Sequence, residues 1–186
     1  DEFGGRVDRP RVEWRRDRDD LGVDPAVGSL DGIDQRVGRG DGHVGRALVV
    51  VPGALPAAVQ WYDTREHDFP ASLPGNVEAV VTDAPEGDVG HLPTGAYVVV
   101  MTHSHALDFD IVEAALHRDD WRYLGLIGSR AKRSQFERRL EARGVAPEVL
   151  SRVTCPIGFG PLKSKEPGVI AVAVAAEILA IREAIP

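Results

Sequence analysis

Four short runs of β-branched, aromatic and other apolar residues constrain the fold of this chain more than any other feature. They cover residues 59–62, 77–81, 97–101 and 123–127. Their length and nearly continuous apolar character are typical of strands that are buried on both faces of a parallel sheet. We therefore predict four strands.

Segments with helical periodicity follow two of these runs. Residues 107–118 and 129–143 each place apolar side chains near one helical face. Residues 169–185 are rich in Ala, Ile and Val and follow Pro167, which suits the start of a long buried helix. The alternation of strands and helices predicts an α/β protein with a Rossmann-like, doubly wound, mostly parallel sheet and flanking helices.

Composition limits the number of domains and the kind of partner. A length of 186 residues, 43% of them hydrophobic, suits one α/β domain. The net charge of −7 argues against a nucleic-acid partner. No apolar run of about 18 residues and no charged-then-apolar leader is visible, so we expect no membrane span, no signal peptide and a cytoplasmic location. The single cysteine, Cys155, excludes an internal disulfide and a multi-cysteine metal site within one chain.

Residues 1–39 differ from the rest of the chain. They are rich in Asp, Arg and Gly, contain no Lys, and show neither a helical nor a strand period. Such a segment buries too little surface to offset its conformational entropy, so we predict an irregular or disordered segment at 1–39 and a folded domain at 40–186. A frameshifted upstream reading is a sharper hypothesis for this segment. Because the chain starts at Asp1 and not at Met, we expect a fragment.

The first candidate binding site is the segment G-D-G-H-V-G at residues 40–45. It fits the pattern G-x-G-x-x-G, in which Gly40, Gly42 and Gly45 let the backbone approach a phosphate at a helix N-terminus. Asp63, 18 residues after Gly45 at the end of a predicted strand, can accept hydrogen bonds from ribose hydroxyls. The alternative is a chance match in a chain with 20 glycines.

A second candidate anion site lies at residues 125–129, G-L-I-G-S. Gly128 permits close approach of a ligand and Ser129 can cap the following helix. The N–H groups of its first turn, with Arg130 and Lys132 beside them, favour a phosphate. An ordinary helix cap followed by a solvated basic face is the alternative.

Two histidines and the cysteine complete the candidate residues. His103 and His105 follow a predicted strand, where they can converge on one ligand with Asp108 orienting one of them. Two imidazoles and one carboxylate are an incomplete metal set, so we predict no metal site, and structural histidines are the alternative.

Cys155 lies at the edge of a Gly- and Pro-rich turn, followed by Lys163 and Lys165, which could lower its pKa. A thiolate there would suit sulfur transfer. The alternative is a small buried apolar residue at the end of a strand.

Taken in this order, the motifs resemble those of the XdhC/CoxI family of accessory proteins, which handle the molybdenum cofactor for xanthine dehydrogenase and related hydroxylases. The resemblance covers roughly residues 40–183. It rests on Gly-x-Gly-His-Val-Gly, Asp-x-Arg, Thr-His-x-His, Gly-Leu-Ile-Gly-Ser and Cys-Pro-Ile-Gly. The chain has Asp41 and Ser104 where relatives usually have Ala and Asp.

The resemblance implies a domain that holds the molybdenum cofactor (molybdopterin) while a cysteine desulfurase supplies its terminal sulfur. The domain would then deliver the cofactor to xanthine dehydrogenase or a related molybdenum hydroxylase. That role is a maturation chaperone and not a turnover enzyme, so no catalytic residue is assigned, and a homodimer is expected. The cofactor-binding residues would be Gly40, Gly42, His43, Gly45, Asp63, Arg65, His103, His105, Gly128, Ser129, Arg130, Lys132 and Cys155.

The residues are also compatible with two other functions. An NAD(P)-dependent oxidoreductase would bind its nucleotide at residues 40–45 and Asp63, with His103 or His105 as the proton donor. A non-catalytic interaction module is the other, because a fold does not fix a function.

Overall fold

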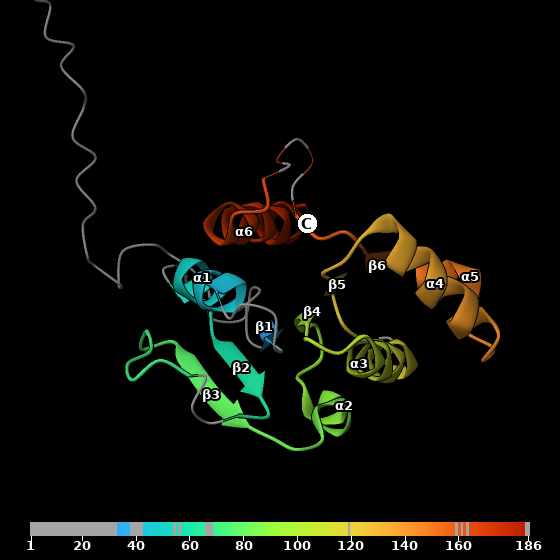
Figure 1. Cartoon of the computed structure of the whole chain (residues 1–186), viewed down its shortest axis with the longest axis horizontal. Helices are drawn as coiled ribbons and strands as arrows, with labels where there is room; N and C mark the ends of the chain where they lie inside the picture. Colours follow the sequence, from blue (N-terminus) through green and yellow to red (C-terminus); the bar gives the residue numbers. More distant parts are fainter. Residues whose placement is uncertain are drawn as a thin grey trace, which may run out of the picture.

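The computed structural model describes residues 33–37, 43–53, 55, 57–65, 69–118, 120–158, 160, 162 and 164–184. Within these residues one sheet of six strands has the order β3-β2-β1-β4-β5-β6, and each pairing is parallel (Figure 1). This is the strand order of the Rossmann fold, so the predicted doubly wound sheet is confirmed. The strands are β1 (Ile33–Val37), β2 (Val59–Asp63), β3 (Val77–Val81), β4 (Tyr97–Met101), β5 (Tyr123–Leu126) and β6 (Val153–Thr154).

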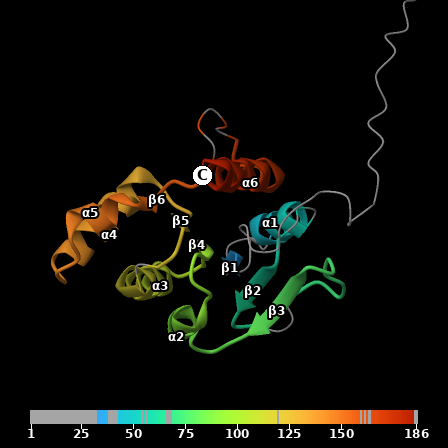
Figure 2. The same ribbon diagram turned by 180° about the vertical axis from the view of Figure 1, so that it is seen from behind.

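Helices cover both faces of this sheet (Figures 1 and 2). One face packs against α1 (His43–Gly53) and α6 (Pro167–Glu183). The other packs against α3 (His105–Arg118), with α2 (Pro85–Asp88), the 3₁₀ helix η2 (Val89–His91), α4 (Arg130–Glu141) and α5 (Pro147–Ser151) around it. Among the described residues, no helix is both long and apolar enough to cross a bilayer.

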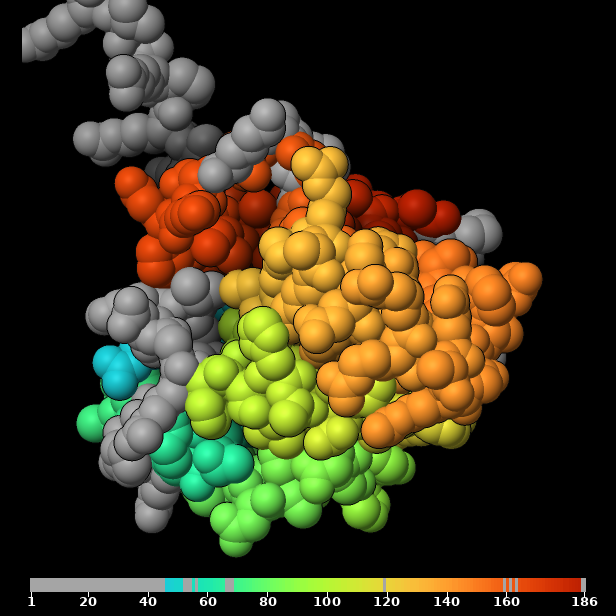
Figure 3. Space-filling model, turned by 45° about the vertical axis from the view of Figure 1, so that its right-hand side comes forward, coloured from blue at the N-terminus to red at the C-terminus, as the bar shows by residue number. Residues whose placement is uncertain are grey.

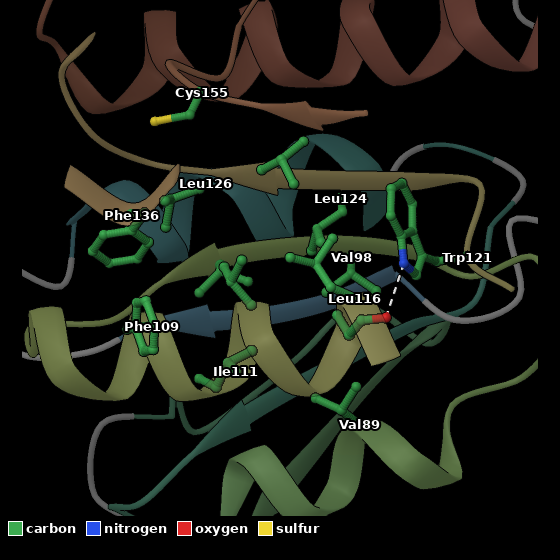
Figure 4. Close-up of a cluster of buried hydrophobic side chains, with 14 of the residues drawn as sticks. Val89, Val98, Phe109, Ile111, Leu116, Trp121, Leu124, Leu126, Phe136 and Cys155 are labelled. Atoms are coloured by element: carbon green, nitrogen blue, oxygen red, sulfur yellow. Dashed lines mark hydrogen bonds between the residues drawn. The ribbon is translucent and has the colours of Figure 1, made fainter. Parts of the chain in front are cut away.

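The continuous apolar character of β4 follows from its place between two cores. Successive side chains of a strand point to opposite faces of the sheet. Tyr97, Val99 and Met101 therefore pack with α1 and α6. Val98, which is labelled in Figure 4, and Val100 pack with α3. All five residues of the strand are buried, which is why the sequence shows no alternation there.

Local signals set the predicted helices. Ser129 caps α4 by accepting a hydrogen bond from the Lys132 N–H at 3.2 Å. Ser104 accepts one from the Leu107 N–H at 3.3 Å, so α3 begins at His105, two residues before the predicted start at residue 107. Helix α6 begins at Pro167. Proline is well suited to the first turn, because the backbone N–H that it lacks would have no partner within the helix there.

The prediction that residues 1–39 form no stable element is wrong for its last part. Residues 33–37 form β1, the central strand, in which Ile33 pairs with both Val59 of β2 and Tyr97 of β4. A strand is held by backbone N–H and C=O groups, which its neighbours can pair whatever the side chains are. Residues 1–32 lie outside the described residues.

The prediction of four strands therefore missed β1 and β6. Strand β6 has only the two residues Val153 and Thr154, too few to show a period. Helices α2 and α5, of four and five residues, escaped prediction for the same reason.

Candidate functional site

The predicted site residues that the structure describes collect at one edge of the sheet, because parallel strands bring their carboxyl ends together. Val37 at the end of β1 pairs with Met101 at the end of β4, and Val100 pairs with Leu126 of β5. The strand order reverses between β1 and β4, and ligands of open α/β sheets bind outside the strand ends at such a point. The loop with His103 and His105 follows β4 directly.

The glycine motif at residues 40–45 follows β1 in the chain, and its last three residues open α1. Gly40 and Gly42 lie outside the described residues, whereas His43 and Gly45 belong to the first turn of α1. A helix that follows the central strand is the one that binds a phosphate in dinucleotide folds.

Asp63 is the last residue of β2, and its carboxylate is held by Arg65. Its Oδ1 accepts hydrogen bonds from the Arg65 backbone N–H at 3.1 Å and from Nε at 3.2 Å. The Asp63 side chain is buried, and that of Arg65 is 20% exposed. The pair thus fixes a guanidinium at the end of β2, where nucleotide folds bind a ribose or its phosphate.

The loop after β4 is closed by hydrogen bonds of its own. The Thr102 hydroxyl donates to the Ser104 carbonyl at 2.9 Å and accepts from the Ser104 N–H at 3.1 Å. His103 and His105 are exposed, and neither imidazole has a hydrogen-bond partner in the described part of the chain. The loop therefore presents both rings to solvent.

Asp108 does not orient a histidine, contrary to the prediction. Its Oδ1 accepts a hydrogen bond from the Thr102 N–H at 2.8 Å, and its Oδ2 accepts one from Lys132 Nζ at 2.5 Å. Asp108 is in the first turn of α3 and faces inward, away from the exposed rings. No three His, Cys, Asp or Glu side chains among the described residues could hold a metal ion together.

The loop after β5 places its basic residues in two different environments. Arg130, the first residue of α4, is exposed near the capping Ser129. Lys132 is buried, and its ammonium also donates to the Ile127 carbonyl at 2.9 Å. A Cβ on Gly128 would lie 2.6 Å from Lys132 Cδ, so glycine is needed there because the lysine side chain folds back over the loop.

The Cys155 thiol is buried, which corrects the prediction of a lowered pKa. Burial raises the pKa of Cys155, and the nearby charges of Lys132 and Arg133 oppose this effect without cancelling it. Lys163, one of the two lysines that were expected to act on the thiol, lies outside the described residues, and Lys165 is exposed. The thiol is therefore protonated at neutral pH.

The surroundings of Cys155 agree with a packing role. The side chain lies beside Leu126 and Phe136 in the core on the α3 side (Figure 4). Its Sγ is 3.9 Å from the Ser129 carbonyl oxygen, to which the thiol can donate weakly. The geometry matches the alternative interpretation, a small buried apolar residue at the end of a strand.

Comparison with known protein families identifies the family of this chain. A model described as the XdhC Rossmann domain matches residues 39–178. The chain belongs to the XdhC family.

Two known proteins show how much of such a protein this XdhC Rossmann domain represents. It is 28% identical over 148 residues to a protein of Escherichia coli K12 named "Uncharacterized protein YqeB", and the match covers 79% of this chain and 27% of YqeB. It shares its fold with a protein of Bacillus halodurans described as a xanthine dehydrogenase. That superposition has a TM-score of 0.66 at 20% identity and covers 83% of this chain and 44% of the other. The chain thus spans less than half the length of either relative.

Sequence reasoning overlooked a cluster that holds the Cys-Pro-Ile-Gly turn of this XdhC Rossmann domain. Glu177 of α6 accepts hydrogen bonds at Oε2 from the Tyr123 hydroxyl at 2.7 Å and from the Gly158 N–H at 2.8 Å. Burial, then the charge of Glu177, raises the pKa of Tyr123 well above its usual range. The sequence does contain a signal for this cluster, because Tyr123 and Gly125 are two residues apart and so lie on the same face of the strand. A glycine next to a large side chain on one face indicates that another part of the molecule approaches closely there.

Proposed function

We propose that this XdhC domain binds the molybdenum cofactor as an accessory protein that supports its sulfuration and insertion into xanthine dehydrogenase or a related hydroxylase. One observation carries the proposal. The XdhC-type motifs after β2, β4 and β5 lie at one edge of the sheet, around the point where the strand order reverses. That edge is where open α/β sheets bind their ligands.

The residues present at this edge suit an anionic ligand such as a pterin that carries a phosphate. Helix α4 directs its first N–H groups to the edge, and Arg130 is exposed beside them. The two buried carboxylates near the edge, Asp63 and Asp108, are each paired with a cation. In the described part of this edge, an approaching anion would therefore meet N–H groups, a guanidinium and the imidazoles of His103 and His105, and neither Asp63 nor Asp108 would face it unpaired.

The roles of the residues follow from this placement. When bound, the cofactor would bring the molybdenum that receives the terminal sulfur, and the chain would supply the residues that hold it. Ser129 and Arg130 would hold the phosphate at the start of α4. His103 and His105 would contact the ligand from the neighbouring loop.

The state of Cys155 favours binding over sulfur transfer by this domain. A buried, protonated thiol is a poor nucleophile. In the proposed function the sulfur comes from a cysteine desulfurase partner, and the domain holds and protects the cofactor. Cys155 packs beneath the loop that follows β5 and is not an intermediate carrier.

A nicotinamide-dependent oxidoreductase is a second candidate, favoured by one specific observation. The strand order is that of dinucleotide-binding proteins, and Asp63 with Arg65 stands at the end of β2, where the adenosine ribose is recognised. The engagement of the Asp63 carboxylate by Arg65 reduces its capacity to accept from ribose hydroxyls. A bound 2′-phosphate would instead find the guanidinium.

Anaerobic incubation of the purified protein with molybdenum cofactor, followed by gel filtration, tests the proposal. We expect pterin and molybdenum in the protein peak at close to one per chain, and the elution volume also tests the predicted dimer. Arg130→Ala should reduce retention, whereas Arg138→Ala, at an exposed position two turns further along α4, should not. NAD⁺ and NADP⁺ are tested in parallel. Binding of a nucleotide without cofactor would favour the oxidoreductase, and binding of neither would favour an interaction module.

A further inference from the structure

A buried ion pair joins the starts of two helices next to the proposed site. Asp108 in the first turn of α3 is fully buried, and Lys132 in the first turn of α4 is 8% exposed. Lys132 Nζ lies 2.5 Å from Asp108 Oδ2. Helices α3 and α4 border each other on the molecular surface (Figure 3). Beneath that surface, Phe109 packs edge-on against Phe136.

Each member of the pair also holds one loop of the site. Asp108 Oδ1 accepts a hydrogen bond from the Thr102 N–H, at the base of the histidine loop. Lys132 Nζ donates to the Ile127 carbonyl, at the base of the loop that leads into α4. Four groups therefore form a continuous chain from the end of β4 to the end of β5, buried at the ion pair and partly buried at its two ends.

Stability alone does not account for this arrangement. Removing two charges from water is costly, and apolar side chains of similar volume often stabilise a fold equally well. A hydrogen-bonded pair gives something that apolar packing does not, because its bonds have fixed directions and lengths. The pair Arg133–Glu137 differs from it, because it is about one third exposed and joins two residues of the same helix. Arg133 reaches outside α4 through a separate hydrogen bond to the Cys155 carbonyl at 3.4 Å.

We propose that the Asp108–Lys132 pair is a positioning device that fixes the histidine loop relative to the start of α4, so that both loops hold one ligand. The inference rests on the proposed cofactor binding and adds to it. Lys132 is then a positioning residue that acts through Asp108 and the Ile127 carbonyl, and the ligand is held by the exposed residues of the two loops.

The decisive variant replaces both charges by apolar side chains, Asp108→Leu with Lys132→Met. Because neither charge is left without its partner, we expect a urea midpoint close to that of the wild type. Amide hydrogen exchange of the free protein should nonetheless become on the order of tenfold faster in residues 101–106 and in residues 126–132, because the bonds that fix both loops are gone. Retention of molybdenum cofactor on gel filtration should weaken by a similar factor.

Two further variants keep the test decisive. Asp108→Asn changes little volume and still accepts from the Thr102 N–H, so exchange should rise in residues 126–132 even if the double variant fails to fold. Glu137→Gln removes the exposed pair on the same helix and should leave exchange in both loops unchanged. Unchanged exchange in both loops of the double variant, or in residues 126–132 of Asp108→Asn, would overturn the proposal.

The same experiment separates this inference from the proposed function. Exchange is measured on the protein alone, so a wild type that retains no cofactor would refute the proposed function while exchange still decides whether the pair fixes the loops. A double variant that retains cofactor as well as the wild type does, despite faster exchange, would refute the positioning role and leave cofactor binding intact.

Discussion

Replacing Gly125 by alanine tests how tightly the turn after β6 is held against the sheet. Gly125 lies within β5, where it pairs with Val99 on one side and Thr154 on the other, so its backbone cannot move away. A Cβ at this position would lie 2.6 Å from the Cε1 and hydroxyl oxygen of Tyr123 and 2.7 Å from Ile157 Cγ2. The tyrosine ring must therefore leave its place.

The cost has two parts. Forcing a methyl group into a packed core costs about 1–3 kcal/mol. Displacing the ring also breaks the hydrogen bond from Tyr123 to the Glu177 carboxylate, and bonds to charged groups contribute about 1.5–3 kcal/mol. Alanine recovers about 0.5–1 kcal/mol of the conformational cost of glycine in a strand. We therefore expect Gly125→Ala to lower the free energy of unfolding by about 2–5 kcal/mol.

Urea unfolding followed by circular dichroism measures this change, and two variants make it specific. Gly75→Ala is the control, because a Cβ there meets no atom within 4 Å, and its effect should stay within about 0.5 kcal/mol. Tyr123→Phe removes the hydrogen bond without adding volume, so Gly125→Ala should cost at least about 1 kcal/mol less in that background. A Gly125→Ala protein as stable as the wild type would refute the account of this cluster.

Three further predictions concern Cys155, Arg118 and Gly128. Because burial raises the pKa of Cys155, iodoacetamide at pH 7 should modify the native protein at least about tenfold more slowly than the urea-unfolded chain, and a rate inflection below pH 7 would contradict this. Arg118→Met removes hydrogen bonds to two backbone carbonyls of the α2–β4 segment and should cost about 2–4 kcal/mol in urea unfolding. The Arg118 hydrogen bond also lowers the pKa of Asp120, so the ionised carboxylate stabilises the folded protein at pH values above the carboxyl pKa of the unfolded chain. This stabilisation is lost as the pH falls through the lowered pKa. The wild type should therefore lose more stability than the variant below about pH 4. Gly128→Asp should lower the free energy of unfolding by about 1–3 kcal/mol, because its Cβ would clash with the buried Lys132 side chain. It should also remove anion binding at this loop. An unchanged urea midpoint would refute the clash.

The elements that the sequence predicted are those with a local signal. Strands β2 to β5 are apolar runs, and α3, α4 and α6 show either a helical stripe or a proline at the start. The doubly wound, parallel arrangement was also predictable, because strand–helix alternation leaves few ways to wind a sheet. Strand β1 gave no such signal, since it is a polar run whose place between β2 and β4 depends on pairing with strands distant in sequence.

The location of the site was predictable for the same reason, but the partners of its side chains were not. Motifs that follow parallel strands must meet at one edge of the sheet. Whether a lysine in such a motif faces a ligand or the interior depends on how two helices pack, and Lys132 finds Asp108 at 24 positions' separation. The pKa of Cys155 likewise depends on burial between β6 and α4, which the flanking lysines in the sequence do not reveal.

Together these contacts divide the residues of the site into those that hold the loops and those that remain available. Each loop is fixed by a carboxylate that is itself engaged, through the pairs Asp63 with Arg65, Asp108 with Lys132 and Glu177 with Tyr123. Among the described motif residues, those left exposed at the edge are His103, His105, Ser129 and Arg130, and none of these four is acidic. In the proposed function, a site whose described carboxylates are held in internal bonds would favour an anion, and its fixed loops would spare that anion the entropy of ordering them.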